Sequence, residues 1–173
     1  VQADLSTVAG AQGFIAAARA KLGRLDTLVN NAGTYLDTNF DDLTEAAFDR
    51  TFNLNVKGYL FAAQAFVKGL APGQENPSII CTGSTNSLAA EKNSVIYDTS
   101  KGAVLMLVRN LAVTLAERGI RVNGIGPGII ETPLSAKGLA APGVRPALER
   151  QIPLGRIGLP DDIGGAAVFL ASP

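Results

Sequence analysis

The chain has 173 residues, enough for one domain with a substantial hydrophobic core. Hydrophobic residues make up 47% and charged residues 17%, a balance that excludes an intrinsically disordered protein. Fifteen basic residues balance fifteen acidic ones without forming a basic cluster, and no apolar run reaches membrane-spanning length. We therefore expect neither a nucleic-acid nor a membrane partner.

Few side chains are available for chemistry. The sequence has no histidine, which is the usual general base and the commonest metal ligand. Cys81 is the only cysteine, so an intramolecular disulfide and a cysteine-based zinc site are excluded, and we expect it to be an unreactive core residue. Proton transfer must therefore use Tyr, Lys, Asp, Glu or a bound cofactor.

In the first half of the chain, short apolar runs alternate with helical patterns. VQADL, residues 1–5, is predicted to be the end of a strand. An alanine-rich helix is predicted over Thr7–Leu22, and the run RLDTLVN predicts a strand that ends in the turn NAG. The pattern from Thr44 to Leu70 predicts a long helix, which Pro72-Gly73 ends.

The second half repeats this alternation. SIICTG, residues 78–83, predicts a buried strand, and Val95–Arg118 a second long helix. IRVNGIGPG, residues 120–128, predicts another strand with a glycine-rich exit. LSAKGLAAPGVRP, residues 134–146, is typical of a loop, and PDDIGGAAVFLA, residues 160–171, predicts a short helix that begins at a proline.

Alternating helices and uniformly apolar strands predict a single α/β domain over residues 1–173. The expected fold is a doubly wound parallel sheet in a Rossmann-like, three-layer α/β/α arrangement. Such folds bind ligands at the carboxyl ends of their strands. The segments NAG, TGS and GPG each follow a predicted strand and are the candidate ligand-binding loops.

Tyr97 and Lys101, in YDTSK, are the first candidate for proton chemistry. Positions i and i+4 share one helix face, and a lysine cation beside a phenol lowers its pKa toward a useful range. The plain alternative is a surface pair on an amphipathic helix. Ser84 follows a predicted strand thirteen residues before Tyr97, where it could hydrogen-bond a substrate oxygen or simply cap a turn.

With these residues in view, the sequence resembles the short-chain dehydrogenase/reductase family. The motifs that carry the resemblance stand in the family's order along the whole chain: NNAG (30–33), NVKG (55–58), Ser84, YDTSK (97–101), RVNGIGPG (121–128) and IIET (129–132). Each motif is weak alone, but six in this order are highly specific. The resemblance implies an NAD(P)-dependent oxidoreductase that interconverts a secondary alcohol and a ketone.

The resemblance implies a catalytic role for four residues. Tyr97 would be the general acid/base, and Lys101 would lower its pKa and bind the nicotinamide ribose. Ser84 would orient the substrate oxygen. Asn55 would hold a water that links Lys101 to solvent, although it could also be a buried polar residue satisfied by helix backbone.

The resemblance also implies a binding site for NAD or NADP. Its residues would come from the start of the chain and from the strand-end loops: Asp4, Leu5, Asn31, Ala32, Gly33, Tyr97, Lys101, Pro127, Gly128, Ile130 and Thr132. Taken alone, Asp4 could equally cap a turn or helix, and the Asn-Ala-Gly and Pro-Gly pairs could be simple turns.

The family's usual first strand, its glycine-rich phosphate-binding turn and its second strand have no counterpart here, and neither does its last strand. We therefore expect an incomplete sheet in which Val1–Leu5 has no partner, and we expect the chain to be part of a longer one. The choice between NAD and NADP normally depends on residues after the second strand. A catalytically inactive nucleotide-binding or scaffolding domain is the alternative function.

The resemblance suggests a sugar, polyol or 3-oxoacyl substrate, with specificity from Asn86–Asn93 and Leu134–Pro146. It also implies a cytoplasmic homodimer or homotetramer assembled through Thr44–Leu70 and Val95–Arg118. The alternative is that these two helices only cover the sheet and form no interface between subunits.

Overall fold

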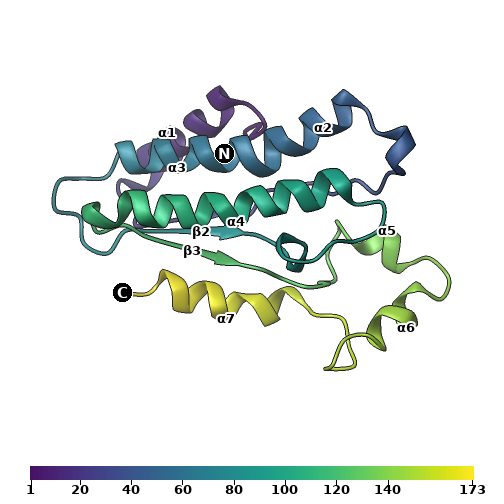
Figure 1. The fold of residues 1–173 in the computed structure, drawn as a ribbon. Coiled ribbons are helices and arrows are strands. Elements are labelled where there is room, and N and C mark those ends of the chain that lie inside the picture. The colour runs from purple at the N-terminus through teal and green to yellow at the C-terminus, as the bar shows by residue number, and fades with distance from the viewer.

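Three short strands form a parallel sheet at the centre of the computed structural model, which describes residues 1–173 (Figure 1). They are β1 (Thr27–Asn30), β2 (Ser78–Thr82) and β3 (Arg121–Ile125), and they lie side by side in that order. Val29 is in register with Ile80, and Ile80 with Asn123. The carboxyl ends of all three strands therefore meet at one edge of the sheet.

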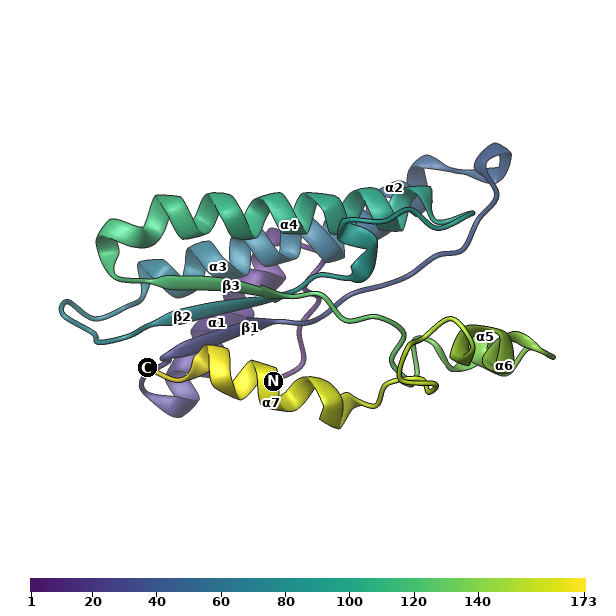
Figure 2. The ribbon, with the colours of Figure 1, turned by 60° about the horizontal axis from the view of Figure 1, so that its bottom comes forward.

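Helices cover both faces of this sheet. The helices are α1 (Val8–Leu22), α2 (Glu45–Phe52), α3 (Tyr59–Lys68), α4 (Val95–Leu115), α5 (Ala136–Leu139), α6 (Val144–Glu149) and α7 (Pro160–Ala171). Helices α3 and α4 lie along one face, with α1 packed against α3, and α7 lies along the other face (Figure 2). This arrangement confirms the predicted parallel α/β fold class.

Side chains point alternately to the two faces of the sheet along each strand, so the buried residues are divided between these faces. Ile79 and Cys81 of β2 are fully buried with Phe66 of α3 and Val104 of α4. Ile80, on the opposite side of the same strand, is also fully buried, on the face that α7 covers. A strand buried on both faces explains the unbroken apolar run SIIC.

Local signals set where the first helices begin and end. The side chain of Thr7 accepts a hydrogen bond from the Gly10 amide, 3.0 Å away, and that of Thr44 accepts one from the Ala47 amide, 3.2 Å away. These threonines cap α1 and α2 by satisfying amides that lack helical partners. Gly23 ends α1 with a φ of 78°, a conformation that favours glycine.

The long helix predicted over Thr44–Leu70 is interrupted by a wider turn. Between α2 and α3, Asn53–Gly58 forms a π-helical segment that contains the NVKG motif. Such segments are frequent at functional sites because they rotate a side chain out of regular helical register. The segment carries Asn55 into the interior, where it is completely buried.

The strand predicted at Val1–Leu5 is wrong. These residues make no ladder to the sheet, and Asp4 instead begins a turn that leads into α1. A strand exists only when it has a hydrogen-bonding neighbour, and the expectation that this segment would have none in the sheet is confirmed.

The loop predicted over residues 134–146 is also wrong in part. It contains α5 and the start of α6. These helices have four and six residues, too few to give a recognisable apolar period in the sequence.

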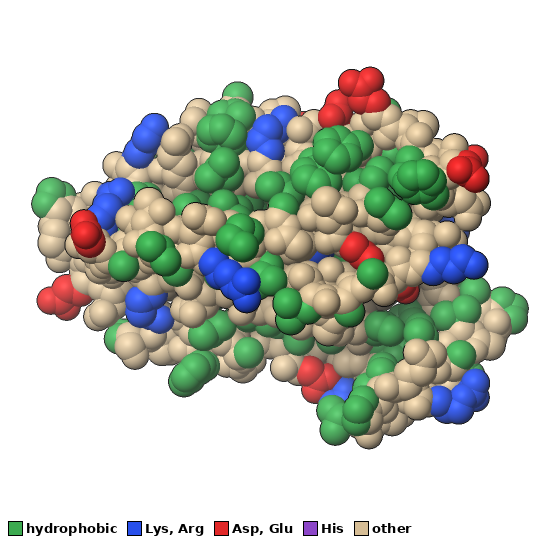
Figure 3. Space-filling model, in the orientation of Figure 1, with side chains coloured by type: hydrophobic (Ala, Val, Ile, Leu, Met, Phe, Trp, Pro, Cys, Tyr) green, Lys and Arg blue, Asp and Glu red, His purple; other side chains and the backbone are tan.

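The outer faces of the long helices carry exposed apolar side chains. Met106 and Val113 of α4 are 52% and 80% exposed, and hydrophobic side chains are spread among Lys and Arg over the visible surface (Figure 3). Homodimer or homotetramer formation through these helices remains a prediction. None of the helices combines the length and apolar character needed to cross a membrane.

Candidate active site

Lys101 lies in a buried position between two tyrosine rings. Only 4% of the residue is exposed, and its Nζ donates a hydrogen bond to the backbone carbonyl of Thr82, 2.8 Å away. The same Nζ is 5.6 Å from the ring centroid of Tyr97 and 5.9 Å from that of Tyr59. The spacing of YDTSK therefore places the lysine beside the tyrosine, and β2 holds it there.

Burial dominates the electrostatics of Lys101. It lowers the pKa of the ammonium group to about 8, while the neighbouring Cys81 acts weakly in the opposite direction. The thiol of Cys81 has its own pKa raised to about 11 by burial, as expected for an unreactive core residue.

Tyr97 lies edge-on to Tyr35, with ring centroids 5.0 Å apart and planes 80° apart. Burial raises the pKa of the Tyr97 phenol, the Ser84 hydroxyl lowers it, and the negative charges of Asp98 and Glu91 raise it further. The helical spacing alone predicted a lowered pKa next to Lys101. In the structure the net direction is upward, because desolvation of the phenolate outweighs the stabilising contacts.

Ser84 lies two residues beyond β2 and begins a short 3₁₀ turn over Thr85–Ser87. Its Oγ accepts a hydrogen bond from the Asn86 amide, 3.1 Å away, and its own amide donates to the Ser87 Oγ at 3.3 Å. Ser84 therefore caps a turn, as one of the two interpretations predicted, and its hydroxyl is next to the Tyr97 phenol. A hydrogen bond from Ser84 to a substrate oxygen stays a prediction.

Asn55 joins the first strand-end loop to both long helices. Its Oδ1 accepts a hydrogen bond from the Thr34 amide at 2.9 Å, and its Nδ2 donates to the Thr34 carbonyl at 3.0 Å and to the Ser100 Oγ at 3.1 Å. Ser100 in turn donates to the carbonyl of Tyr97, 2.7 Å away. The partners of Asn55 are a loop and a side chain, whereas the plain alternative expected helix backbone.

The NAG segment borders the same cluster. A Cβ atom on Gly33 would lie 3.3 Å from the Asn55 Oδ1 and 3.9 Å from the Lys101 Nζ, so only glycine leaves this approach to Lys101 open. Asn31 and Ala32 line an apolar groove beside β1 together with Leu5. Three of the predicted cofactor contacts therefore share one groove, and a fourth faces Lys101.

Asp4 has a local structural role in this chain. Its Oδ1 accepts hydrogen bonds from the amide and the hydroxyl of Ser6, at 3.0 and 2.6 Å. These bonds form the turn that precedes α1, and they lower the pKa of the carboxyl group.

The exit from β3 divides into two parts. The Pro127 carbonyl accepts a hydrogen bond from the Thr85 amide at 3.0 Å, and a Cβ on Gly128 would lie 3.9 Å from the Thr85 methyl group, so both residues border the Ser84 turn. Ile130 and Thr132 are tied to Ser135, whose Oγ donates to the Ile130 carbonyl at 2.7 Å and accepts from the Thr132 amide at 3.0 Å. No hydrogen bond joins this second part to Tyr97 or Lys101.

Several residues that shape the site were not predicted as site residues. Tyr35, Thr82 and Ser100 touch Tyr97 or Lys101, and Asn86 and Asp98 meet behind Ser84. Tyr35 offered one usable signal, because it is an aromatic residue two positions after a strand-end turn. Thr82 acts through its backbone carbonyl, Ser100 through a small hydroxyl on α4, and Asn86 and Asp98 through loop geometry, and none of these leaves a pattern in the sequence.

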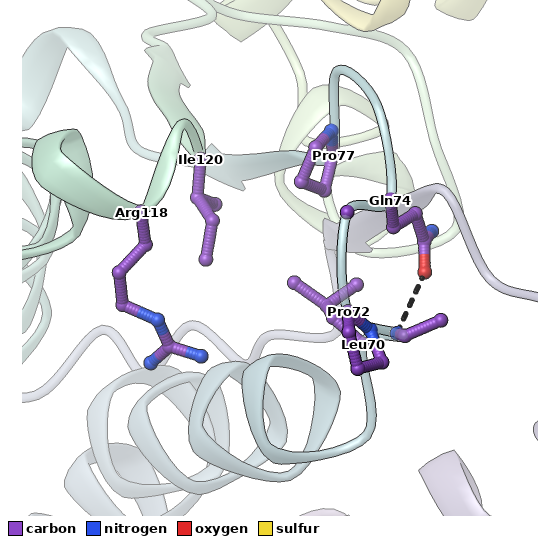
Figure 4. Close-up of a pocket in the computed structure, with 8 residues that line it drawn as sticks. Leu70, Pro72, Gln74, Pro77, Arg118 and Ile120 are labelled. Atoms are coloured by element: carbon purple, nitrogen blue, oxygen red, sulfur yellow. Dashed lines mark hydrogen bonds between the residues drawn. The ribbon is translucent and has the colours of Figure 1, made fainter.

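A separate pocket lies at the opposite edge of the sheet (Figure 4). Pro77 and Ile120 precede β2 and β3, so this pocket is at the amino ends of the strands, away from Ser84. Its polar groups are engaged locally: Arg118 donates to the Val67 carbonyl at 3.3 Å, and Gln74 accepts from the Ala71 amide at 3.2 Å.

Comparison with known proteins gives a consistent family. The sequence model of a family described as enoyl-(acyl carrier protein) reductase matches residues 1–173. An uncharacterised oxidoreductase of Methylorubrum extorquens is 42% identical over 173 residues, which are 99% of this chain and 68% of the relative. The chain belongs to the short-chain dehydrogenase/reductase family. It spans about two thirds of the length of that relative.

Two solved short-chain dehydrogenase/reductase structures illustrate the likeness. A glucose/ribitol dehydrogenase from Brucella melitensis is 32% identical, with a TM-score of 0.91 over 100% of this chain and 68% of its own. A gluconate 5-dehydrogenase from Burkholderia cenocepacia, solved with NADP and tartrate, is 31% identical, with a TM-score of 0.91 over 98% of this chain and 66% of its own. These likenesses confirm the Rossmann-like fold and the resemblance read from the motifs.

Proposed function

We propose that this chain carries the catalytic residues of an NAD(P)-dependent oxidoreductase that interconverts a secondary alcohol and a ketone. The observation that carries the proposal is the buried Lys101 ammonium, fixed on the Thr82 carbonyl and 5.6 Å from the Tyr97 ring. A cation kept beside a phenol at the carboxyl edge of a parallel sheet suits proton transfer to or from a bound alcohol.

The residues present fit a nicotinamide cofactor. Lys101 has three N–H donors and uses one on Thr82, which leaves two for ribose hydroxyl groups. Gly33 leaves the space next to Lys101 free of a side chain, and the groove lined by Leu5, Asn31 and Ala32 would hold the adenosine part. Pro127, Gly128, Ile130 and Thr132 would border the nicotinamide end. The cofactor supplies the hydride acceptor or donor when it is bound.

The protein's own part of the reaction is to move one proton and orient one oxygen. In oxidation, the phenolate oxygen of Tyr97 takes the alcohol proton while the substrate carbon loses hydride. In reduction, the phenol returns that proton to the developing alkoxide. The Ser84 hydroxyl would hold the reacting oxygen, and Asn55 would hold the water that connects Lys101 to solvent.

For the substrate, we propose a sugar or polyol ahead of a 3-oxoacyl compound. Both solved relatives above are named as dehydrogenases of sugar-type substrates. Within this class, the carboxylates of Asp98 and Glu91 near Tyr97 favour an uncharged sugar or polyol over a sugar acid such as gluconate, which they would repel.

Binding and turnover assays would test the proposal. Quenching of protein fluorescence or enhancement of nicotinamide fluorescence would measure NADH and NADPH binding. Oxidation would then be followed at 340 nm over hexoses, pentitols and gluconate, and reduction over a 3-oxoacyl thioester. Turnover of a sugar or polyol with either cofactor would support the proposal. Tight cofactor binding without turnover of any alcohol or ketone would contradict it and favour a non-catalytic domain.

A further inference from the structure

The turn that carries Ser84 is joined to α4 by a carboxylate next to Tyr97. The Oδ1 atom of Asp98 accepts a hydrogen bond from the Asn86 Nδ2 at 2.7 Å, and its Oδ2 accepts one from the Glu91 amide at 2.7 Å. Both bonds are short and charge-assisted, and such bonds are about twice as strong as neutral ones. They connect α4 to the turn and to the loop that follows it.

Asn86 extends this connection to Ser84. Its backbone amide donates to the Ser84 Oγ at 3.1 Å, and the Ser84 Oγ lies 3.5 Å from the Asn86 Oδ1. The Asn86 Nδ2 is engaged by Asp98 and also by the Glu91 Oε2, 3.2 Å away. With its amide nitrogen directed to the two carboxylates, Asn86 presents its oxygen toward Ser84.

We propose that Asp98 is a positioning residue, which fixes the Ser84 hydroxyl beside Tyr97 through Asn86. The inference rests on the proposed function, because it assigns a task within the same site. Neither residue belongs to the Ser–Tyr–Lys–Asn set, and the link between them is formed across twelve residues by loop geometry. Asp98 therefore acts on the reaction through another side chain and does not touch the substrate.

Asp98 also contributes charge to the site. The groups around Tyr97 are the Lys101 ammonium on the same helix, the carboxylates of Asp98 and Glu91, and the phenols of Tyr35 and Tyr59. The carboxylates raise the pKa of Tyr97. Loss of the Asp98 charge alone would lower this pKa, whereas displacement of the Ser84 hydroxyl, which is the larger influence, would raise it. A positioning role therefore predicts that the pH profile of oxidation moves toward higher pH, which loss of a charge alone would not do.

The test compares Asp98→Asn and Asn86→Ala with the unaltered protein. We expect each variant to lower kcat for alcohol oxidation about 10- to 100-fold, a typical cost of a misplaced catalytic group. The dissociation constant for NADH or NADPH should change less than about twofold, since neither residue faces the cofactor groove. Both variants should also move the pH profile of oxidation to higher pH, because the Tyr97 phenolate loses the Ser84 hydroxyl; a shift to lower pH in Asp98→Asn would show that only its charge matters and would overturn the positioning role. Glu117→Gln, which removes a carboxylate at the far end of α4, is the charge control and should leave both unchanged.

The reciprocal pair Asp98→Asn with Asn86→Asp gives a rescue. Made together with Glu91→Gln, which removes the carboxylate that would repel the one introduced at position 86, it restores one carboxylate and one amide with the donor and acceptor exchanged. It should recover most of the kcat lost in Asp98→Asn. If Asp98→Asn does not fold, as judged by circular dichroism, Asn86→Ala and the reciprocal pair decide the question.

Different outcomes test the positioning role of Asp98 and the proposed oxidoreductase function. Normal kcat in Asp98→Asn or Asn86→Ala, or no recovery in a folded reciprocal pair, would overturn the positioning role alone. Absence of turnover in the unaltered protein would overturn the proposed function, and the positioning role with it.

Discussion

The ammonium group of Lys101 donates a hydrogen bond to the backbone carbonyl of Thr82, the last residue of β2, at 2.8 Å. Ser84 follows two residues later, and Tyr97 lies one helical turn before Lys101 on α4. One contact between a helix and the end of a strand therefore sets the relative positions of the three groups to which we assign the chemistry. It also removes a charged lysine from water, which has consequences for stability.

Lys101→Met should stabilise the protein at neutral pH while removing activity. Burial lowers the lysine pKa from 10.5 to about 8, and this difference of roughly 2.5 units corresponds to about 3 kcal/mol of charge-burial cost. Loss of the charge-assisted bond to Thr82 offsets about 1.5 to 2 kcal/mol, so a gain of about 1 to 1.5 kcal/mol in the free energy of unfolding is expected at pH 7. Urea denaturation measures it, with the exposed Lys68→Met as a control.

The sign of the pH dependence follows from the lowered pKa. Between pH 8 and 10.5 the unfolded chain binds more protons at this lysine than the folded chain, so the stability of the unaltered protein rises with pH there. The advantage of Lys101→Met should therefore be full below pH 8 and shrink by pH 10. An advantage that grew with pH, or a variant less stable at pH 7, would contradict the burial argument.

Asn55→Ala should destabilise the fold strongly for a single polar change. The side chain is completely buried and makes three hydrogen bonds, two to Thr34 and one to Ser100. Their loss, which leaves buried partners unsatisfied, should lower the free energy of unfolding by about 2 to 4 kcal/mol. Asn110→Ala removes an exposed asparagine from α4 and should change the free energy of unfolding by less than about 0.5 kcal/mol. Similar effects at the two positions would refute the joining role of Asn55.

Two glycine-to-alanine changes should shift the free energy of unfolding in opposite directions. At Gly58, in the π-helical segment, a Cβ would collide with the backbone carbonyl of Leu5, and the variant should lose about 1 to 3 kcal/mol. At Gly13, in the middle of α1, nothing lies within 4 Å of the added atom, and higher helix propensity should gain about 0.5 to 1 kcal/mol. Thermal unfolding of both variants checks the prediction, and stabilisation at Gly58 would show that the turn before α1 is not held there.

The pH profiles of the two reaction directions should differ. Burial and nearby carboxylates raise the pKa of Tyr97, so the phenol predominates at neutral pH. Oxidation needs the phenolate and should speed up as the pH rises from 6 to 8, above which Lys101 begins to lose the charge that stabilises the phenolate. Reduction needs the phenol and should be fastest near neutrality. Initial rates in both directions across this range test the assignment. An oxidation rate that is flat from pH 6 to 8 would argue against Tyr97 as the base.

Sequence reasoning succeeded where one residue type in one local pattern sufficed. The apolar strands and the i, i+4 spacing of Tyr97 and Lys101 each determine a local geometry, and the long helices appear within a few residues of the predicted bounds. It failed where geometry depends on distant neighbours. The segment Val1–Leu5 has strand-like residues but no partner, and α5 and α6 are too short to carry a period.

The site divides in the same way. Ser84, Tyr97, Lys101 and Asn55 could be selected from motif order, and the structure brings them together around Thr82 and Ser100. Asn86 and Asp98 could not be selected, because their contact is made by a turn whose path the sequence does not specify. The upward shift in the Tyr97 pKa could not be predicted from the sequence either, because it depends on how deeply the ring is buried.

Turnover by Tyr97→Phe tests the central claim most directly. The change removes only the hydroxyl oxygen and keeps the ring against Tyr35 and Lys101. We predict that kcat for alcohol oxidation falls by about 10²- to 10⁴-fold, while circular dichroism and the dissociation constant for NADH or NADPH stay close to those of the unaltered protein. A folded, cofactor-binding variant that kept most of its turnover would contradict the assignment of Tyr97 as the general acid/base.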